Sequence, residues 1–239
     1  MNSTIKTSLV MLMLGGSQSF AAGMKPPSTN NLPPAGIESH KSFFIGQVFT
    51  GYYGGVGLTA TGTVANFAEG FPFQLRLGLG YNRVNAGDPL LARKVFINNN
   101  ANGTPTKTAT VWDERLDILY PVKLFSLTRT MLFAGPRHSN FDAHFEYIGG
   151  AETFDVVDDQ WGLGAGLETS FALSPRVDMV FTGGADYFFP AELSGHDTYY
   201  RPNNVNIHPI DNYTYKDAEA AINQPGVMTR LMAGIAYHF

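Results

Sequence analysis

The most constraining feature of this 239-residue sequence is a two-residue alternation of large apolar side chains with small or polar ones. The alternation is clearest over residues 71–82, where one face carries Phe71, Phe73, Leu75, Leu77, Leu79 and Tyr81. The other face carries Gln74, Arg76, Gly78, Gly80 and Asn82. A helix would scatter both sets around its circumference, whereas an extended strand separates them onto opposite faces. The alternation therefore predicts β-strands with one apolar and one polar face.

Stretches of this kind predict about eight strands within residues 42–239, and we expect them to close into an antiparallel up-and-down transmembrane β-barrel. The predicted strands are 42–53, 56–66, 71–82, 110–122, 131–147, 160–171, 177–189 and 227–239. We expect a bulge at Gly135–Pro136, because proline cannot donate to the ladder. Short periplasmic turns are expected near Glu69, Phe125 and Ser174–Pro175. The expected extracellular loops lie near 54 and at 85–107, 137–157 and 190–225, with a short helix at Asp217–Ile222.

Composition agrees with a barrel. The sequence is 44% hydrophobic with a mean hydropathy of −0.07, and no stretch of the mature chain is long and apolar enough to predict a transmembrane helix. Cysteine is absent, which excludes disulfides and thiol metal sites. The net charge of −4 argues against a nucleic-acid partner. A soluble β-sandwich is the competing architecture, but charged residues opposite the apolar faces favour the barrel.

The amino-terminal sequence predicts secretion. Lys6 precedes the apolar run Leu9–Leu14, and small residues follow at Ser19–Ala22. This order is typical of a signal peptide, so we expect residues 1–22 to be removed after Ala21 or Ala22. An uncleaved anchor is the alternative, although the run is short for a membrane span. Residues 23–41 are rich in proline and are expected to form an extended periplasmic segment.

The carboxyl-terminal strand carries the clearest family signal. One face of residues 227–239 is apolar and ends at an aromatic terminus: Val227, Leu231, Ala233, Ile235, Tyr237 and Phe239. This ending resembles the closing strand of bacterial outer-membrane β-barrels, and the whole pattern resembles the OmpA-like and OmpX-like eight-stranded barrels without a periplasmic domain at the carboxyl end. The resemblance implies a monomer in a Gram-negative outer membrane, in contact with lipid and lipopolysaccharide. It also implies that Ile235, Tyr237 and Phe239 are recognised by periplasmic chaperones and the barrel assembly machinery.

The charged residues on the polar strand faces are expected to line the lumen. They are Arg76, Asp113, Arg115, Asp117, Asp142, His144, Glu146, Glu168, Asp178, Asp186 and Arg230. A charge in a narrow lumen must be paired, because desolvating it alone costs several kcal/mol. We therefore predict a network of ion pairs that plugs the barrel. A narrow pore is the alternative, with room left on the inner wall by Gly78, Gly80, Gly162, Gly164 and Gly166.

Enzymatic activity is not expected. His138 and Ser139, with Glu146 downstream, resemble the catalytic residues of barrel enzymes that remove acyl chains from lipid A. In those enzymes one residue separates histidine from serine, whereas adjacent residues on a strand point apart. We interpret His138 as a strand-end or loop residue and keep a lipid A hydrolase as an alternative function. Asp142, His144 and Glu146 share a strand face, but we expect an internal hydrogen-bonded network there, with no metal and no cofactor.

Aromatic residues suggest how the barrel meets its surroundings. Girdles at the headgroups are predicted from Trp112, Tyr120, Phe141, Tyr147, Tyr187, Phe189 and Tyr237. The last loop is rich in tyrosine, and tyrosine gives large contact area at low entropic cost. We predict that a host or surface receptor is contacted by Tyr199, Tyr200, Arg201, Tyr213 and Tyr215. A solvated loop without a ligand is the alternative. The family resemblance adds roles in envelope integrity or surface attachment.

Overall fold

The computed structural model describes residues 43–67, 70–124, 127–210 and 212–239. The predicted signal peptide at 1–22 and the proline-rich segment at 23–41 lie outside the described residues. Within these ranges neither helix is long and apolar enough to cross a membrane.

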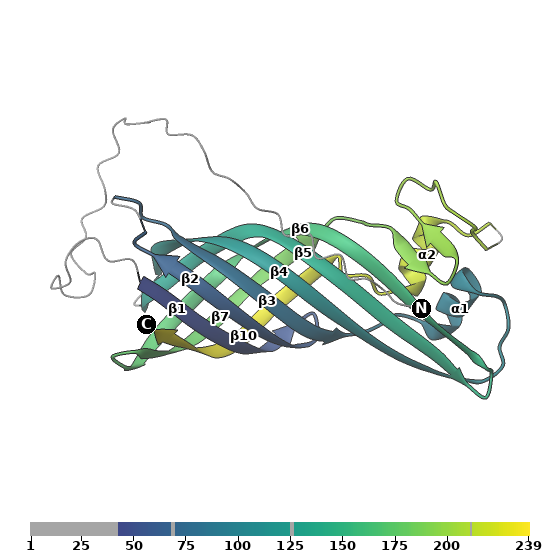
Figure 1. The fold of residues 1–239 in the computed structure, drawn as a ribbon, viewed down its shortest axis with the longest axis horizontal. Helices are drawn as coiled ribbons and strands as arrows, with labels where there is room; N and C mark the ends of the chain where they lie inside the picture. Colours follow the sequence, from purple (N-terminus) through teal and green to yellow (C-terminus); the bar gives the residue numbers. More distant parts are fainter. Residues whose placement is uncertain (1–42, 68–69, 125–126, 211) are drawn as a thin grey trace. The chain divides into compact units, whose positions relative to one another are not determined.

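Eight strands form one closed antiparallel sheet (Figure 1). They are β1 (Phe43–Tyr53), β2 (Val56–Ala65), β3 (Gln74–Val84), β4 (Thr104–Leu124), β5 (Leu127–Ile148), β6 (Glu152–Ser174), β7 (Val177–Phe188) and β10 (Val227–His238). Each strand from β1 to β7 pairs with the next, β7 pairs with β10, and β10 returns to β1 with partners from Ile45↔His238 to Tyr53↔Arg230. This closure confirms the predicted barrel and excludes the sandwich.

The strands fall into two length classes. β1, β2, β3, β7 and β10 have 11, 10, 11, 12 and 12 residues, and a tilted strand needs about 9–11 residues to cross a bilayer. β4, β5 and β6 have 21, 22 and 23 residues. In Figure 1 these three strands continue toward the end where both helices lie, opposite the carboxyl terminus. Only their lower halves, next to the carboxyl-terminal end of the barrel, match the length of the other strands.

The upper halves of β4, β5 and β6 carry a folded addition that we call the cap, residues 85–111, 140–160, 189–210 and 212–226. It contains α1 (Pro89–Phe96), β8 (Leu193–Gly195), β9 (Thr198–Tyr200) and α2 (Tyr215–Ala221). β8 extends the sheet from β6 through Val156↔Gly195, and β9 pairs with β8.

Local sequence sets where the two cap helices begin. α1 begins after Asp88, whose carboxylate accepts hydrogen bonds from the backbone N–H groups of Leu90 and Leu91. Thr214 and Asp217 form a capping box at the start of α2. The short helix predicted at 217–222 is therefore present, beginning two residues earlier.

Two predictions about β5 are wrong. The loop expected at 137–157 is strand on both sides of a turn at residues 149–151, where Gly149 and Ala151 have φ values of 81° and 54°. The bulge expected at Gly135–Pro136 is absent, since the β4–β5 register is the same at Arg115↔Arg137 and at Ile118↔Ala134. The register shift lies instead between Val122 and Leu124. The loop prediction is wrong because β5 and β6 continue as strands beyond the point where they leave the hydrocarbon.

Outside the cap, the barrel wall is apolar outward, and its inner face carries buried polar groups together with apolar residues such as Phe49 and Met232. Large side chains such as Leu77 and Leu163 are 65% and 58% exposed on the outer surface. Inward positions on the same strands hold buried polar groups, for example Arg76, Asp117 and Glu168. This is the arrangement of a barrel surrounded by hydrocarbon.

Candidate functional site

The lower lumen contains a network of buried ion pairs. Arg76 lies 3.0 Å from Asp117 and 2.6 Å from Glu168, measured between nitrogen and oxygen atoms. Gln47 donates from Nε2 to the Glu168 carboxylate at 2.8 Å, and Thr61 donates to Gln47 Oε1 at 2.9 Å. All five side chains are buried. The network therefore links strands β1, β2, β3, β4 and β6 across the interior.

Arg137 extends this network and was not among the predicted lumen residues. Its guanidinium lies 2.8 Å from Asp117 and 2.9 Å from Asp186, and all three side chains are fully buried. Arg230 also pairs with Asp186, and Arg115 pairs with Asp113. The sequence prediction placed Arg137 in a loop, although the alternation from Phe133 through Gly135 to Arg137 already indicated an inward position. Four arginines thus face four carboxylates, so the network is neutral: Arg76, Arg115, Arg137 and Arg230 against Asp113, Asp117, Glu168 and Asp186.

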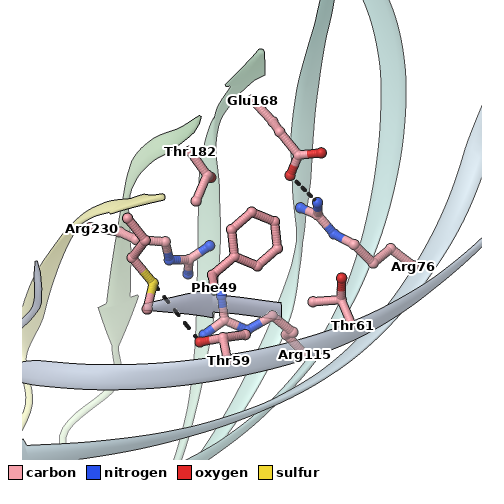
Figure 2. Close-up of a pocket in the computed structure, with 9 residues that line it drawn as sticks. Phe49, Thr59, Thr61, Arg76, Arg115, Glu168, Thr182 and Arg230 are labelled. Atoms are coloured by element: carbon pink, nitrogen blue, oxygen red, sulfur yellow. Dashed lines mark hydrogen bonds and ion pairs between the residues drawn. The ribbon is translucent and has the colours of Figure 1, made fainter. Parts of the chain in front are cut away.

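Little space remains between these side chains. Figure 2 shows Phe49 and Thr182 among Arg115, Arg230 and Glu168 in the middle of the lumen. The volume open to the centre of a water-sized sphere there is about 10 Å³, and one water needs about 10–15 Å³. The glycine positions predicted to leave room are occupied. A Cβ at Gly80 would lie 2.0 Å from Asp113 Oδ1.

The predicted lumen residues divide into two groups. Arg76, Asp113, Arg115, Asp117, Glu168, Asp178, Asp186 and Arg230 are buried at inward positions. Asp178 lies apart from the central network, 3.2 Å from Arg129 and 3.0 Å from His238 near the carboxyl-terminal end. The remaining three, Asp142, His144 and Glu146, lie on the outer face of β5, which corrects the prediction.

The error at Asp142, His144 and Glu146 has one cause. They lie in the cap, where water replaces hydrocarbon outside the wall, so the polar face of β5 turns outward. The opposite face, expected to meet lipid, is buried inside the cap: Phe141, Ala143, Phe145 and Tyr147. Phe141 and Tyr147 are therefore not girdle residues. Burial and the nearby Asp155 raise the pKa of Asp142. His144 Nδ1 lies 2.6 Å from Asp155 Oδ1.

The cap has its own apolar core. Phe96 of α1 meets the Tyr200 ring edge-on at 5.3 Å between centroids, and Phe145 stacks on Phe154 at 5.3 Å. Arg93 lies over the Tyr147 ring at 4.3 Å and pairs with Glu152 at 2.6 Å. The helices therefore cover the inner face of the extended sheet.

This core also corrects the predicted recognition residues. Tyr200 and Tyr215 are 0% and 5% exposed, so they stabilise the cap and offer almost no contact area to a partner. Tyr213 packs partly against the same core. Tyr199 is half-buried on β9, and Arg201 pairs with Glu192 at the surface.

His138 lies in the middle of β5 and points outward, so its assignment to a loop or strand end is wrong. Nε2 is 2.7 Å from Asp159 Oδ1, Nδ1 is 3.7 Å from Glu114 Oε2, and the ring lies 4.8 Å from the Trp161 ring. Ser139 points into the barrel and is fully buried, so it cannot serve as a nucleophile for His138. Among the described residues, no three His, Asp or Glu side chains are placed to hold a metal ion together.

The outer belt and the carboxyl terminus follow the barrel pattern. Trp112, Tyr187, Phe189 and Tyr237 are 39–50% exposed on the outer wall, and Tyr120 is half-buried. Ile235, Tyr237 and Phe239 lie on this wall, and the Phe239 N–H donates to the Phe44 carbonyl at 3.1 Å. Their recognition by the assembly machinery stays a prediction.

Comparison with known proteins places the fold. No family model and no curated protein matches the chain. A solved structure of a major outer membrane protein from Thermus thermophilus has a TM-score of 0.66 and 22% identity, covering 84% of this chain and 100% of that one. The chain has the fold of a small outer-membrane β-barrel. Ail of Yersinia pestis, at 12% identity, covers 83% of this barrel chain and 95% of its own with a TM-score of 0.43.

Proposed function

We propose that this chain is a non-enzymatic outer-membrane barrel whose lumen is closed by ion pairs and whose cap makes contacts at the cell surface. The closed eight-stranded sheet with an apolar outer wall supports the membrane location. Three of the four connections at the cap end include a folded element or a long strand extension, whereas Pro175–Arg176 at the other end is a two-residue turn. In outer-membrane barrels the longer connections are extracellular.

The observation that carries the closed lumen is Arg137 between Asp117 and Asp186, with all three side chains fully buried. Moving one of these groups aside would leave a buried charge without its partner, which costs about 3–5 kcal/mol. A path for ions requires several such separations at once. The network therefore favours a plug over a pore.

Conductance in a planar bilayer tests the plug. We expect the wild-type protein to give no steady channels. The double variant Arg137→Ala with Asp186→Ala removes an ion pair and the volume that it fills, so it should admit ions and serves as the positive control. Steady channels from the wild type, abolished by Gly164→Phe, would show that the lumen is a pore.

The cap supports the proposed attachment because it holds surface residues on a rigid sheet. Binding residues are often placed on a rigid scaffold in this way. Tyr199 and Arg201 lie at or next to β9, and Asp142, Glu146 and Asp155 lie on the outer face of β5 and β6. These residues replace the buried Tyr200 and Tyr215 as candidate contacts.

Attachment is tested with cells that express the protein. Wild-type expression should raise adherence to host cells or a solid surface above an empty-vector control. Tyr199→Ala with Arg201→Ala should reduce that gain, whereas Val48→Ala on the lipid-facing wall should not. Equal adherence with and without the protein would leave only the envelope role, measured as sensitivity of a deletion strain to detergent.

A further inference from the structure

A cluster of buried oxygen atoms lies at the base of the cap, next to the ion-pair network. It is formed by Ser139 of β5 with Asp158 and Gln160 of β6, and we call it the oxygen cluster. The three residues are 0%, 7% and 1% exposed. Ser139 is paired directly with Gln160, and Asp158 is the next inward residue along β6. Directly opposite residues such as Ser139 and Gln160 have Cβ atoms about 4.5–5.5 Å apart, and diagonal neighbours such as Ser139 and Asp158 are about 7–8 Å apart, within reach of a shared ion and its waters.

Four oxygen atoms of the oxygen cluster form no hydrogen bond of ordinary geometry. Ser139 Oγ, both carboxylate oxygens of Asp158 and Gln160 Oε1 are buried without a hydrogen bond of ordinary geometry from any described residue. Gln160 Nε2 does have an acceptor, the Phe189 carbonyl at 3.2 Å. The atoms left over are therefore all oxygens. Buried oxygens without partners are costly and require a donor or a cation.

The charge balance separates Asp158 from the network below it. The four arginines of that network are matched by four carboxylates, of which Asp158 is not one. Arg137, the guanidinium nearest in the β5 sequence, is committed to Asp117 and Asp186. The Gln224 amide, which donates to the Ala191 carbonyl at 3.3 Å, and the Phe141 backbone N–H also approach the Asp158 carboxylate, but neither group carries a positive charge.

The outer wall at this level is polar, so the cluster lies beyond the hydrocarbon. Asp159, next to Asp158, points outward with a side chain that is 66% exposed.

We propose that Ser139, Asp158 and Gln160 form a binding site for a hard divalent cation, with Ca²⁺ as the best fit. Ca²⁺ takes 6–8 oxygen ligands in flexible geometry, including bidentate carboxylates and amide carbonyls, and waters complete its shell. One carboxylate and two neutral oxygens suit this chemistry and offer neither nitrogen nor sulfur for softer metals. The ion compensates Asp158 and ties the cap to the barrel where β5 and β6 leave the membrane.

Terbium luminescence tests the site in the full-length barrel in detergent at pH 8. After chelator treatment, we expect saturable binding of one Tb³⁺ per chain, sensitised by nearby tyrosines and displaced by Ca²⁺. Asp158→Asn keeps the shape of the side chain and should weaken binding at least about tenfold, the loss of one charged ligand. Glu114→Gln is the matched control, because Glu114 also loses one carboxylate charge but faces outward on β4 with a side chain that is 67% exposed. It should bind Tb³⁺ like the wild type.

Heat-dependent gel mobility provides an independent readout. Ca²⁺ should raise the unfolding temperature of the wild type by several degrees and leave Asp158→Asn unchanged. After chelator treatment, the variant should unfold at a temperature no lower than that of the wild type, because it has lost an uncompensated buried charge. Misfolding of the variant would then not explain its weaker binding. Absence of saturable binding, or equal binding by Asp158→Asn, would overturn the proposal and assign the cluster to water or a proton.

Discussion

The lower and upper halves of β4, β5 and β6 share the same two-residue alternation with opposite polarity. In the lower half Asp117 is buried in the lumen, and its neighbour Ile118 is 51% exposed on the outer wall. In the upper half Phe145 is buried, and its neighbour Glu146 is exposed. The strand geometry is continuous, so what changes is the surrounding solvent. The apolar face turns toward hydrocarbon where lipid surrounds the wall, and toward α1 and α2 where water does.

The two halves also differ in how their interiors are stabilised. The lower interior combines neutralised ion pairs with a small buried apolar cluster that includes Phe49, Val180 and Met232. Most of the other large apolar side chains at this level face outward. The upper interior is a two-layer packing of helices on a sheet, as in soluble domains. Substitutions of the same kind should therefore have different effects in the two halves.

The largest effect is expected from Arg137→Met. It leaves Asp117 and Asp186 short of a buried partner, so the free energy of unfolding should fall by about 3–5 kcal/mol. Denaturant unfolding in micelles measures the change. Arg129→Met is the control, because the Arg129 side chain is 51% exposed beside Asp178, and its loss should cost below about 1 kcal/mol. Equal losses from the two variants would refute the importance of the buried network.

The apolar core of the cap should respond to Phe145→Ala. Removing a fully buried ring costs about 3 kcal/mol or more, and the loss should appear as faster proteolysis and hydrogen exchange in the cap. Leu77→Ala, on the lipid-facing wall of β3, should change the free energy of unfolding little, because lipid occupies the vacated space. A cap that stays protected in Phe145→Ala would contradict an inward-facing Phe145.

A matched pair of lysine substitutions compares the outer faces of the two halves. Leu132 on lower β5 and Val157 on upper β6 are 46% and 43% exposed. Leu132→Lys puts a charge into the hydrocarbon and should cost about 2–4 kcal/mol. Val157→Lys lies opposite Asp142 in water and should cost below about 0.5 kcal/mol. If both variants unfold like the wild type, the lower wall is not in lipid.

The smallest effect concerns the tip of the cap at acid pH. Hydrogen bonds from Asn98 and Arg93 and the charge of Arg93 lower the pKa of Glu152 from 4.5. A carboxylate whose pKa is lowered on folding stabilises the folded state at pH values above its pKa in the unfolded state. This contribution is lost as the pH falls through its pKa in the folded state. Hydrogen exchange of α1 should therefore accelerate below about pH 4.5. The free energy that protects its amide hydrogens should fall by less than about 1 kcal/mol. Glu152→Gln should remove that pH dependence, and an unchanged profile in this variant would assign the effect to another group.

The sequence predicted the barrel because alternation depends only on strand geometry. Predicting the direction of each face needed more, since residues 140–147 alternate as regularly as residues 71–82. The apolar face was assigned to lipid in both places, which is correct for Leu77 and wrong for Phe145. An apolar face toward lipid in both halves of β5 requires a break between them, and Arg137 was therefore assigned to a loop. Tyr200 and Tyr215 were predicted at the surface because a tyrosine in a loop carries no sign that a helix will cover it.

The most direct test of the polarity reversal is a scan of single cysteines along β5, since the sequence has no cysteine of its own. Spin labels at Leu132→Cys and Ala134→Cys should collide with oxygen dissolved in lipid. Labels at Asn140→Cys and Asp142→Cys should collide with a water-soluble nickel complex, and Phe141→Cys and Ala143→Cys should be shielded from both. Oxygen collisions at residues 141 and 143 would place the upper half of β5 in the membrane and contradict the reversal.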